Sequence, residues 1–270
     1  MAIGSLITRL FPVLIALGVA SVIEVLAPLR SQPRLLNGRL ATNLTLLAIT
    51  LSLGLLLNFI LAIGAAYADQ HGTGVLQLLG LGPITTLIVA FVTLDAASYL
   101  VHRLMHQTPA FWRFHVVHHM DASVDATTGF RQHPFEGLLR FGFIAAPAWL
   151  LGAPPASIAI FRLLSAVNSA LEHANIRVPR VLDRIFVSLC VTPDMHKVHH
   201  SRTRTETDSN YANLFSFFDR LFGTYTPSSR GPSVVYGIDG YDGPEHQSVS
   251  AVLLLPLRRS SSLRNPAASP

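Results

Sequence analysis

The amino-acid sequence predicts an all-α, polytopic integral-membrane protein, and three observations support this fold class. Half of the 270 residues are hydrophobic and only 13% are charged. The mean hydropathy of +0.43 is also unusual for a soluble domain. Several apolar stretches approach the length of about 20 residues that crosses the hydrocarbon of a bilayer.

Three apolar segments in the first part of the chain are candidate membrane spans. Residues 6–29 form the first, with Glu24 near one end. Residues 44–67 form the second, in which Asn58 is the only strongly polar residue of the interior. Residues 84–101 form the third, which leads directly into the first histidine motif. Buried helices of a large soluble protein are the alternative, but three nearly uncharged stretches of this length favour the membrane.

A fourth apolar region, residues 137–170, is interrupted by Gly152, Pro154 and Pro155. Glycine and proline end helices, so the region predicts a hairpin of two short helices. The hairpin either crosses the membrane twice or dips into it and returns. The first apolar stretch of the chain lacks the charged start and cleavage site of a signal peptide, which predicts a retained helix.

The distribution of arginine predicts the orientation, because cytoplasmic loops carry an excess of basic residues. Arg30, Arg34 and Arg39 lie between the first two spans, whereas residues 68–83 contain no lysine or arginine. Eleven basic residues follow Glu172. We therefore expect every histidine motif to face the cytoplasm. The net charge of +5 suits acidic lipid head groups, and we expect no nucleic-acid partner.

Eight of the 12 histidines fall into three motifs, H-x3-H and two copies of H-x-x-H-H. On a helix, residues three and four apart share a face, so each motif brings its imidazoles together. Packed imidazoles repel one another when they protonate, near pH 6.5, whereas a bound metal holds them neutral. The motifs therefore predict a metal site formed by His102, His106, His115, His118, His119, His196, His199 and His200.

Eight ligands are too many for one ion, so the motifs predict two metals. Imidazole suits zinc, copper, iron and nickel, and the ligand type alone does not choose among them. The sequence has no H-E-x-x-H zinc-protease helix and no Glu-x-x-His pair of a carboxylate-bridged di-iron bundle. Cys190 is the only cysteine, which excludes an internal disulfide and a thiolate cluster. His133 and His173 stand alone as further candidates, and His71 and His246 are expected at the surface.

These features resemble the fatty acid hydroxylase / sterol desaturase superfamily over roughly residues 85–226, while the first two spans match it only in hydropathy. Its D-x3-Y-x2-H-R-x2-H segment corresponds to Asp95, Tyr99, His102, Arg103 and His106. Later segments correspond to FRQHPFE (130–136), EHANIRVP (172–179), TPDMHKVHHS (192–201) and TDSNYANLFSFFDRLFGTY (207–225).

The resemblance implies a non-haem centre of two Fe ions, which Zn can replace on overexpression, and dioxygen as co-substrate. It makes the eight clustered histidines ligands and adds His173. Some members carry another histidine four residues earlier, where this chain has Ser169. His133 or water fills that place, or one metal has fewer ligands. Carboxylate and hydroxyl groups that orient the ligand imidazoles are expected from Asp95, Tyr99, Glu172 and Asp194.

The expected function is membrane-bound, di-iron hydroxylation or desaturation of a fatty acyl or sterol-like lipid. No reductase motif is present, so electrons come from a separate donor protein and its reductase. Residues 1–82 form the N-terminal spans, 83–226 the catalytic region, and 227–270 a loosely structured tail whose residues 249–257 rest on the membrane surface. The alternatives are a non-catalytic metal-binding membrane protein, such as a carrier or assembly factor, and a zinc-dependent membrane hydrolase.

Overall fold

A computed structural model describes residues 3–31 and 38–258 of the chain. In these ranges the regular elements are helices, and β structure is limited to two isolated bridges, Pro28 with Ile176 and Ser201 with Tyr236. The all-α fold class is therefore confirmed for the described residues.

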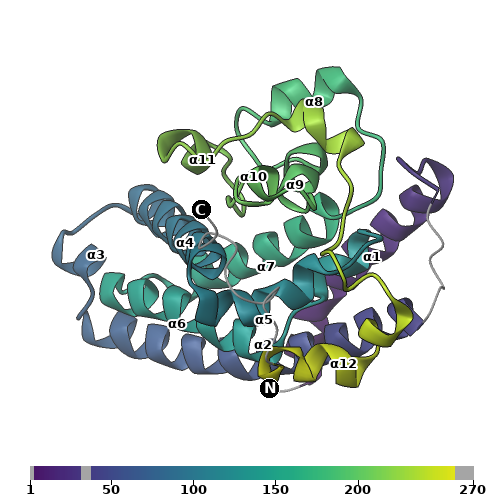
Figure 1. Ribbon diagram of the computed structural model, residues 1–270. Helices are drawn as coiled ribbons and strands as arrows, with labels where there is room; N and C mark the ends of the chain where they lie inside the picture. The colour runs from purple at the N-terminus through teal and green to yellow at the C-terminus, as the bar shows by residue number, and fades with distance from the viewer. Residues whose placement is uncertain (1–2, 32–37, 259–270) are drawn as a thin grey trace.

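Five long helices build the body of the molecule (Figure 1). α6 packs against α2 and α4, and α7 packs against α1 and α4. The short helices α3 and α5 connect or extend this body. The helices are α1 (Ile3–Leu26), α2 (Arg39–His71), α3 (Val75–Leu78), α4 (Pro83–Gln107), α5 (Pro109–His119), α6 (Pro134–Leu151) and α7 (Pro155–Glu172).

Glycine and proline set the ends of these helices as the sequence predicts. α2 begins after Gly38 and ends before Gly72, and both glycines have a left-handed backbone (φ 75° and 59°) that stops a helix. α6 ends at Gly152 (φ 63°), and Pro155 occupies the first turn of α7. The two-helix hairpin predicted for this region is confirmed.

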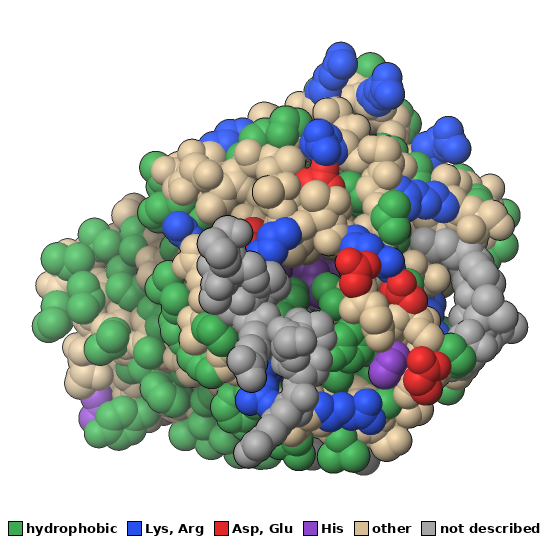
Figure 2. Space-filling model, in the orientation of Figure 1, with side chains coloured by type: hydrophobic (Ala, Val, Ile, Leu, Met, Phe, Trp, Pro, Cys, Tyr) green, Lys and Arg blue, Asp and Glu red, His purple; other side chains and the backbone are tan. Residues whose placement is uncertain are grey.

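Two helical stretches in the described part of the chain are long and apolar enough to cross a membrane. They are residues 39–78, with a mean hydropathy of 2.5, and residues 83–107, with 1.9. A shorter apolar helical run covers residues 11–26. Large apolar side chains are exposed at the end of the molecule near α3, where Leu78, Ile84 and Leu150 are 77, 75 and 71% accessible. Figure 2 shows hydrophobic side chains crowded at this end and basic ones over the opposite, upper part.

The upper part is a cap of four short helices that lies over α7 (Figure 1). It contains many of the arginines that follow α7. Its helices are α8 (Arg180–Phe186), α9 (Pro193–His199), α10 (Arg204–Thr207) and α11 (Phe217–Leu221).

The tail is more ordered between residues 227 and 258 than the sequence indicates. It forms three 3-10 turns and the helix α12 (Val249–Leu254). Tyr241, Val252 and Leu255 are buried against α5 and α2. Serine, proline and glycine suggested a loose segment, but these few apolar residues are enough to anchor it. Residues 259–270 lie outside the described residues.

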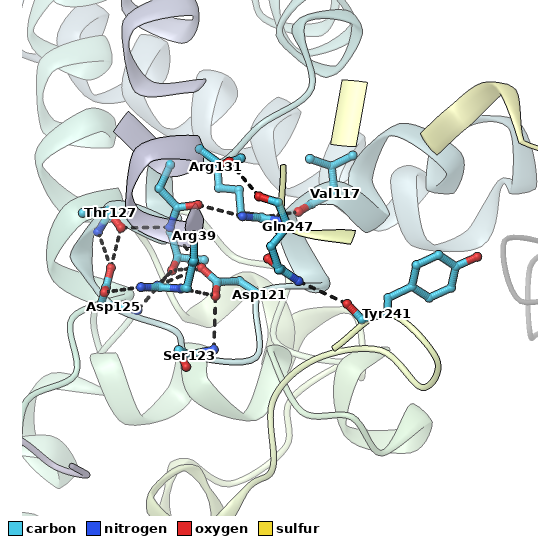
Figure 3. A network of polar contacts seen from close by, with 12 residues as sticks. Arg39, Val117, Asp121, Ser123, Asp125, Thr127, Arg131, Tyr241 and Gln247 are labelled. Atoms are coloured by element: carbon cyan, nitrogen blue, oxygen red, sulfur yellow. Dashed lines mark hydrogen bonds and ion pairs between the residues drawn. The ribbon is translucent and has the colours of Figure 1, made fainter. Parts of the chain in front are cut away.

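A buried polar network holds the start of α2 to the segment that follows α5 (Figure 3). Arg39 makes ion pairs with Asp121 (2.6 Å) and Asp125 (2.9 Å). Arg131 donates to Gln247 of the tail (3.0 Å). Burial alone would raise the pKa of Asp121, but the charges of Arg39 and Arg131 lower it well below its ordinary value.

This network changes the role of Arg39. The sequence placed it among the arginines of the loop between the first two spans, whereas the structure buries it to 5% accessibility in ion pairs. Arg34, which also entered the orientation argument, lies outside the described residues. The orientation argument therefore depends on Arg30 for this loop.

Candidate metal centre

Nine histidines from four places in the chain meet between α4, α5, the end of α7 and α9. Each is at most 5% accessible. They form two groups, and in each group one ring nitrogen per residue lies within 4.8 Å of the others. The first group is His102, His106, His115, His119 and His199, and the second is His118, His173, His196 and His200.

The two H-x-x-H-H motifs are each divided between the groups, which the sequence analysis did not foresee. In α5, His115 and His119 join the first group and His118 the second. Positions i+3 and i+4 of a helix point about 100° apart, to either side of position i. A helix directed between the two groups therefore supplies ligating atoms to both.

α9 repeats this division in the opposite sense. His196 and His200 belong to the second group and His199 to the first. In both helices the i, i+4 pair stays together and the i+3 residue crosses over. Because α5 and α9 each serve both groups, neither group can shift without disturbing the other.

Acceptors outside the first group form hydrogen bonds with three of its five rings, and a carboxylate lies beside a fourth. The Nδ1 atoms of His102 and His199 lie 2.9 and 2.8 Å from the carbonyl oxygens of Tyr211 and Ser209. Two carboxylates act on the others: Asp208 lies 3.3 Å from Nδ1 of His106, and Glu136 lies 3.1 Å from Nδ1 of His115. Contacts of this kind select the tautomer whose other nitrogen is a free acceptor.

The second group has fewer such contacts. His173 Nδ1 lies 2.6 Å from the carbonyl oxygen of Ser169. Its Nε2 lies 3.1 Å from Nε2 of His118 and 2.9 Å from Nε2 of His196. The Nδ1 atoms of His118 and His196 and both ring nitrogens of His200 have no hydrogen-bond partner in the described part of the chain.

Burial disfavours the charged form of six of these imidazoles. It lowers the pKa of His118, His119, His196 and His200 well below 6.5. Burial also lowers the pKa of His173 to about 4 and that of His199 to about 3. At neutral pH, two uncharged ring nitrogens about 3 Å apart share one proton at most. Several other ring nitrogens of these histidines have no hydrogen-bond partner in the described part of the chain. A transition-metal ion in each group satisfies these donors, so the residues fit two metals.

Asp95 and Tyr99 do not contact the histidines, contrary to expectation. Asp95 accepts hydrogen bonds from the side chain of Asn213 and from the backbone N–H groups of Leu214 and Phe215. Tyr99 shares a hydrogen bond with Thr224. Asp95 thus ties α4 to the segment between α10 and α11, and Tyr99 ties it to the segment after α11.

The other two predicted carboxylates differ from each other. Glu172 Oε1 lies 3.7 Å from Nδ1 of His173 and 3.9 Å from Nε2 of His196. Asp194 instead pairs with Lys197, at 3.0 Å. Asp194 therefore neutralises the only lysine of the chain and does not orient an imidazole.

His133 belongs to neither group. Its Nδ1 accepts from the backbone of Phe135 and caps α6, and its Nε2 lies 3.3 Å from the carbonyl oxygen of Leu253. His133 therefore does not replace the additional histidine that some family members carry at the position of Ser169. His71, exposed near α3, and His246 of the tail also lie outside both groups.

The sequence analysis missed Glu136 and Asp208. Glu136 occurs in the quoted FRQHPFE segment, and Asp208 in the TDSNYANLF segment. The only sequence signal that could have identified them is their position within these family-like segments. Neither is spaced regularly from a histidine, so only the fold could pair them with His115 and His106.

A cavity of about 150 Å³ adjoins the centre. His102 of the first group and three histidines of the second, His118, His173 and His196, line it. The second group therefore faces the cavity, whereas the first is largely enclosed.

A family model described as fatty acid hydroxylase matches residues 87–224, which include all nine histidines. An ornithine lipid hydroxylase of Rhizobium tropici is 31% identical over 157 residues, 57% of this chain and 45% of the relative. The human alkylglycerol monooxygenase is 30% identical over 152 residues, 55% of this chain and 32% of the relative.

A very-long-chain aldehyde decarbonylase of Oryza sativa subsp. indica is 31% identical over 144 residues, covering 52% of this chain and 54% of the relative. The chain thus spans between about a third and just over half of the length of these relatives. No solved structure gives a significant match.

Proposed function

The chain belongs to the fatty acid hydroxylase family, and from this premise we propose that it is a membrane-bound, di-iron oxygenase that hydroxylates a lipid, with desaturation as the variant outcome. Dioxygen is the co-substrate. The observation that carries the proposal is the pair of buried histidine groups beside a cavity. The relatives named above for lipid hydroxylation and alkylglycerol oxidation support the substrate class.

The first group would hold one iron and the second group the other. When bound, the irons supply the capacity to activate dioxygen for attack on a C–H bond, which no side chain supplies. The protein orients the nitrogen donors through backbone carbonyls and through Glu136 and Asp208. Trp112 packs on His106 and His119, with ring centroids 5.1 and 5.5 Å apart, and shields the first group from water.

We further propose that α1, α2 and α4 cross the membrane and that the α6–α7 hairpin lies in it. The exposed apolar end near α3 and the basic cap support a placement of the histidines at the cytoplasmic face. In this arrangement residues 1–82 anchor the catalytic region, 83–226, and lipid reaches the cavity from the bilayer. A cysteine introduced between residues 68 and 83 should be labelled only from the opposite, non-cytoplasmic side.

Electrons would come from a separate donor protein with its reductase, because the sequence shows no nucleotide-binding or iron–sulfur motif. The arginines of the cap offer a docking face for an acidic donor. Zinc would occupy the same nitrogens on overexpression, since it stands above iron in the general affinity order.

Labelled dioxygen tests the proposal. Iron-loaded protein is supplied with total membrane lipid, ferredoxin, ferredoxin reductase and NADPH, and the lipids are analysed by mass spectrometry. We expect one labelled oxygen in a hydroxylated lipid, or a product two hydrogens lighter, only when both dioxygen and reductant are present. Lipid turnover that proceeds equally well without oxygen or reductant would contradict the oxygenase and favour the hydrolase.

A further inference from the structure

Two polar residues inside apolar helices meet next to the histidine centre. Asn58 lies in the middle of α2 and Arg162 in the middle of α7. The Nε atom of Arg162 donates a hydrogen bond to Oδ1 of Asn58 (3.1 Å). An ionisable residue in an apolar, membrane-facing helix is costly, and it usually marks a site of function.

Arg162 stands where two cavities meet. The first is the cavity of about 150 Å³ that the histidines line. The second is an apolar channel of about 360 Å³ between α1, α2 and α7, and Asn58 lies in its wall. Five residues line both, namely Thr50, Gly54, Phe130, Arg162 and Ala166. The channel reaches the apolar outer surface, where Ile160 in its wall is 47% accessible.

The polar lining of the first cavity leaves Arg162 without an acidic partner. Arg140 also lines this cavity, and its Nε donates to Glu136 (2.9 Å). Arg140 and Arg162 therefore place two cations on the wall of one cavity. Glu172, on the same cavity, accepts from Asn168 (2.8 Å). No carboxylate in the described part of the chain lies within ion-pair distance of Arg162.

The two terminal nitrogens of Arg162 also make no hydrogen bond to another described residue. A guanidinium matches a carboxylate or a phosphate with two parallel hydrogen bonds. Asn58 holds the third nitrogen, so it fixes the plane in which an incoming oxyanion would be received. The second cation, Arg140, favours a negative charge in the same space.

We propose that Arg162, oriented by Asn58 and assisted by Arg140, binds the oxyanion of a lipid that enters the cavity head-first, with its hydrocarbon chain in the channel. This inference rests on the proposed function and specifies its substrate as an anionic lipid. The cavity holds roughly five water-sized groups, enough for the oxyanion and the first carbons. The C–H bonds presented to the histidine centre are therefore those near the anionic end of the lipid, and not those of the mid-chain.

Binding to zinc-loaded protein, which does not turn over, tests the inference. Three probes share one oleyl or oleoyl chain: oleate, oleoyl lysophosphatidate and oleyl alcohol. In detergent at pH 8 we expect at least one anion to bind about tenfold or more tightly than the alcohol, as a charge-assisted, two-point contact provides. The anion that binds better tells whether a carboxylate or a phosphate is the natural group.

Substitution then assigns the preference to Arg162. Arg162→Met should reduce the anion preference to less than about threefold, with zinc content and alcohol affinity unchanged. Arg162→Lys and Asn58→Ala should reduce it partially, and they keep the test informative if the methionine variant does not fold. Arg184→Met, which removes an exposed arginine of α8 outside both cavities, should behave as the wild type.

Equal affinity of all three probes for the wild type would overturn the inference. So would a methionine variant that keeps the anion preference or loses alcohol binding to the same extent. The oxygenase proposal fails separately: selective anion binding without oxygen-dependent product leaves the lipid site intact and rejects the reaction.

Discussion

The two histidine groups contain the same residue type, but they differ in number of donors, in support and in exposure to the cavity. The first has five histidines, and four of their rings meet acceptors from outside the group. The second has four, with one such backbone contact, and three of them line the cavity. A fully surrounded metal acts mainly as structure or charge, whereas an open coordination position is what chemistry requires.

This difference assigns separate tasks within one centre. Under the proposed function, the second group, with its open side toward the cavity, would be the one that a substrate C–H bond approaches. The first, enclosed by Trp112 and the tail, is positioned more firmly. Because α5 and α9 supply both, the fold joins a group that is open to the cavity to one that is more enclosed.

The largest expected effect comes from removing a ligand from either group. His196→Ala in the second and His199→Ala in the first should each reduce lipid oxidation to background, since each group needs its full set of donors. His246→Ala, a histidine of the tail outside both groups, should retain wild-type activity. Product formation under labelled dioxygen is the measurement. Full activity in either ligand variant would show that its group is not required.

The next effect concerns the polar network of Figure 3, and it should not distinguish the groups. Asp121→Asn leaves Arg39 buried without its closest charge partner, which costs about 3–5 kcal/mol of folding stability. Since Asp121 follows α5, both groups should lose metal together on mild heating. Asp242→Asn, which breaks an exposed pair with Arg202, should cost at most about 1 kcal/mol. Loss of metal from only one group would contradict the shared role of α5.

Glu136→Gln should distinguish the two groups. The amide no longer fixes the imidazole of His115, and loss of an outer contact typically lowers metal affinity about 10–100-fold. We expect a chelator titration to remove one metal at lower chelator concentration, while the second metal dissociates as in the wild type. Arg140→Met removes the hydrogen bond that holds the Glu136 carboxylate, so it should weaken the same metal to a smaller extent. Equal weakening of both metals would remove the distinction between the groups.

The last effect, which concerns the metal-free protein alone, is a pH dependence of folding stability. Burial lowers the pKa of His173 to about 4 and of His199 to about 3, below the value near 6.5 of the unfolded chain. As the pH falls below 6.5, the unfolded state takes up protons that the folded state does not. Stability should therefore fall by about 1.4 kcal/mol per pH unit for each such histidine.

Denaturant unfolding of metal-free protein between pH 7.5 and 5.0 checks this slope. His173→Gln and His199→Gln should each reduce the slope of stability against pH by the contribution of one histidine, about 1.4 kcal/mol per pH unit. A stability that rises on acidification would show that these imidazoles are charged in the folded state, which a metal centre would not tolerate.

Hydropathy and motif spacing predicted much of this molecule. The helix ends at Gly38, Gly72 and Gly152 follow from backbone rules that act locally. The grouping of the eight histidines of the three motifs also follows, because their spacing is helical, whereas His173 was expected only from the resemblance to the family.

What the sequence could not reveal depends on contacts between distant segments. The division of each H-x-x-H-H motif depends on how α5 and α9 are directed relative to the groups. Asp194 was expected near a histidine, but Lys197, three residues away on the same helix, is its partner. The tail is ordered because Tyr241 and Val252 pack against α5. No local sequence pattern predicts this contact between distant segments.

The metal content of the wild-type protein tests the account of two separate histidine groups most directly. The protein is purified anaerobically in detergent, loaded with ferrous iron, freed of excess metal and analysed by native mass spectrometry and elemental analysis. Two irons in each folded chain is the predicted result. One iron or none, in protein whose circular dichroism shows intact helices, would contradict it.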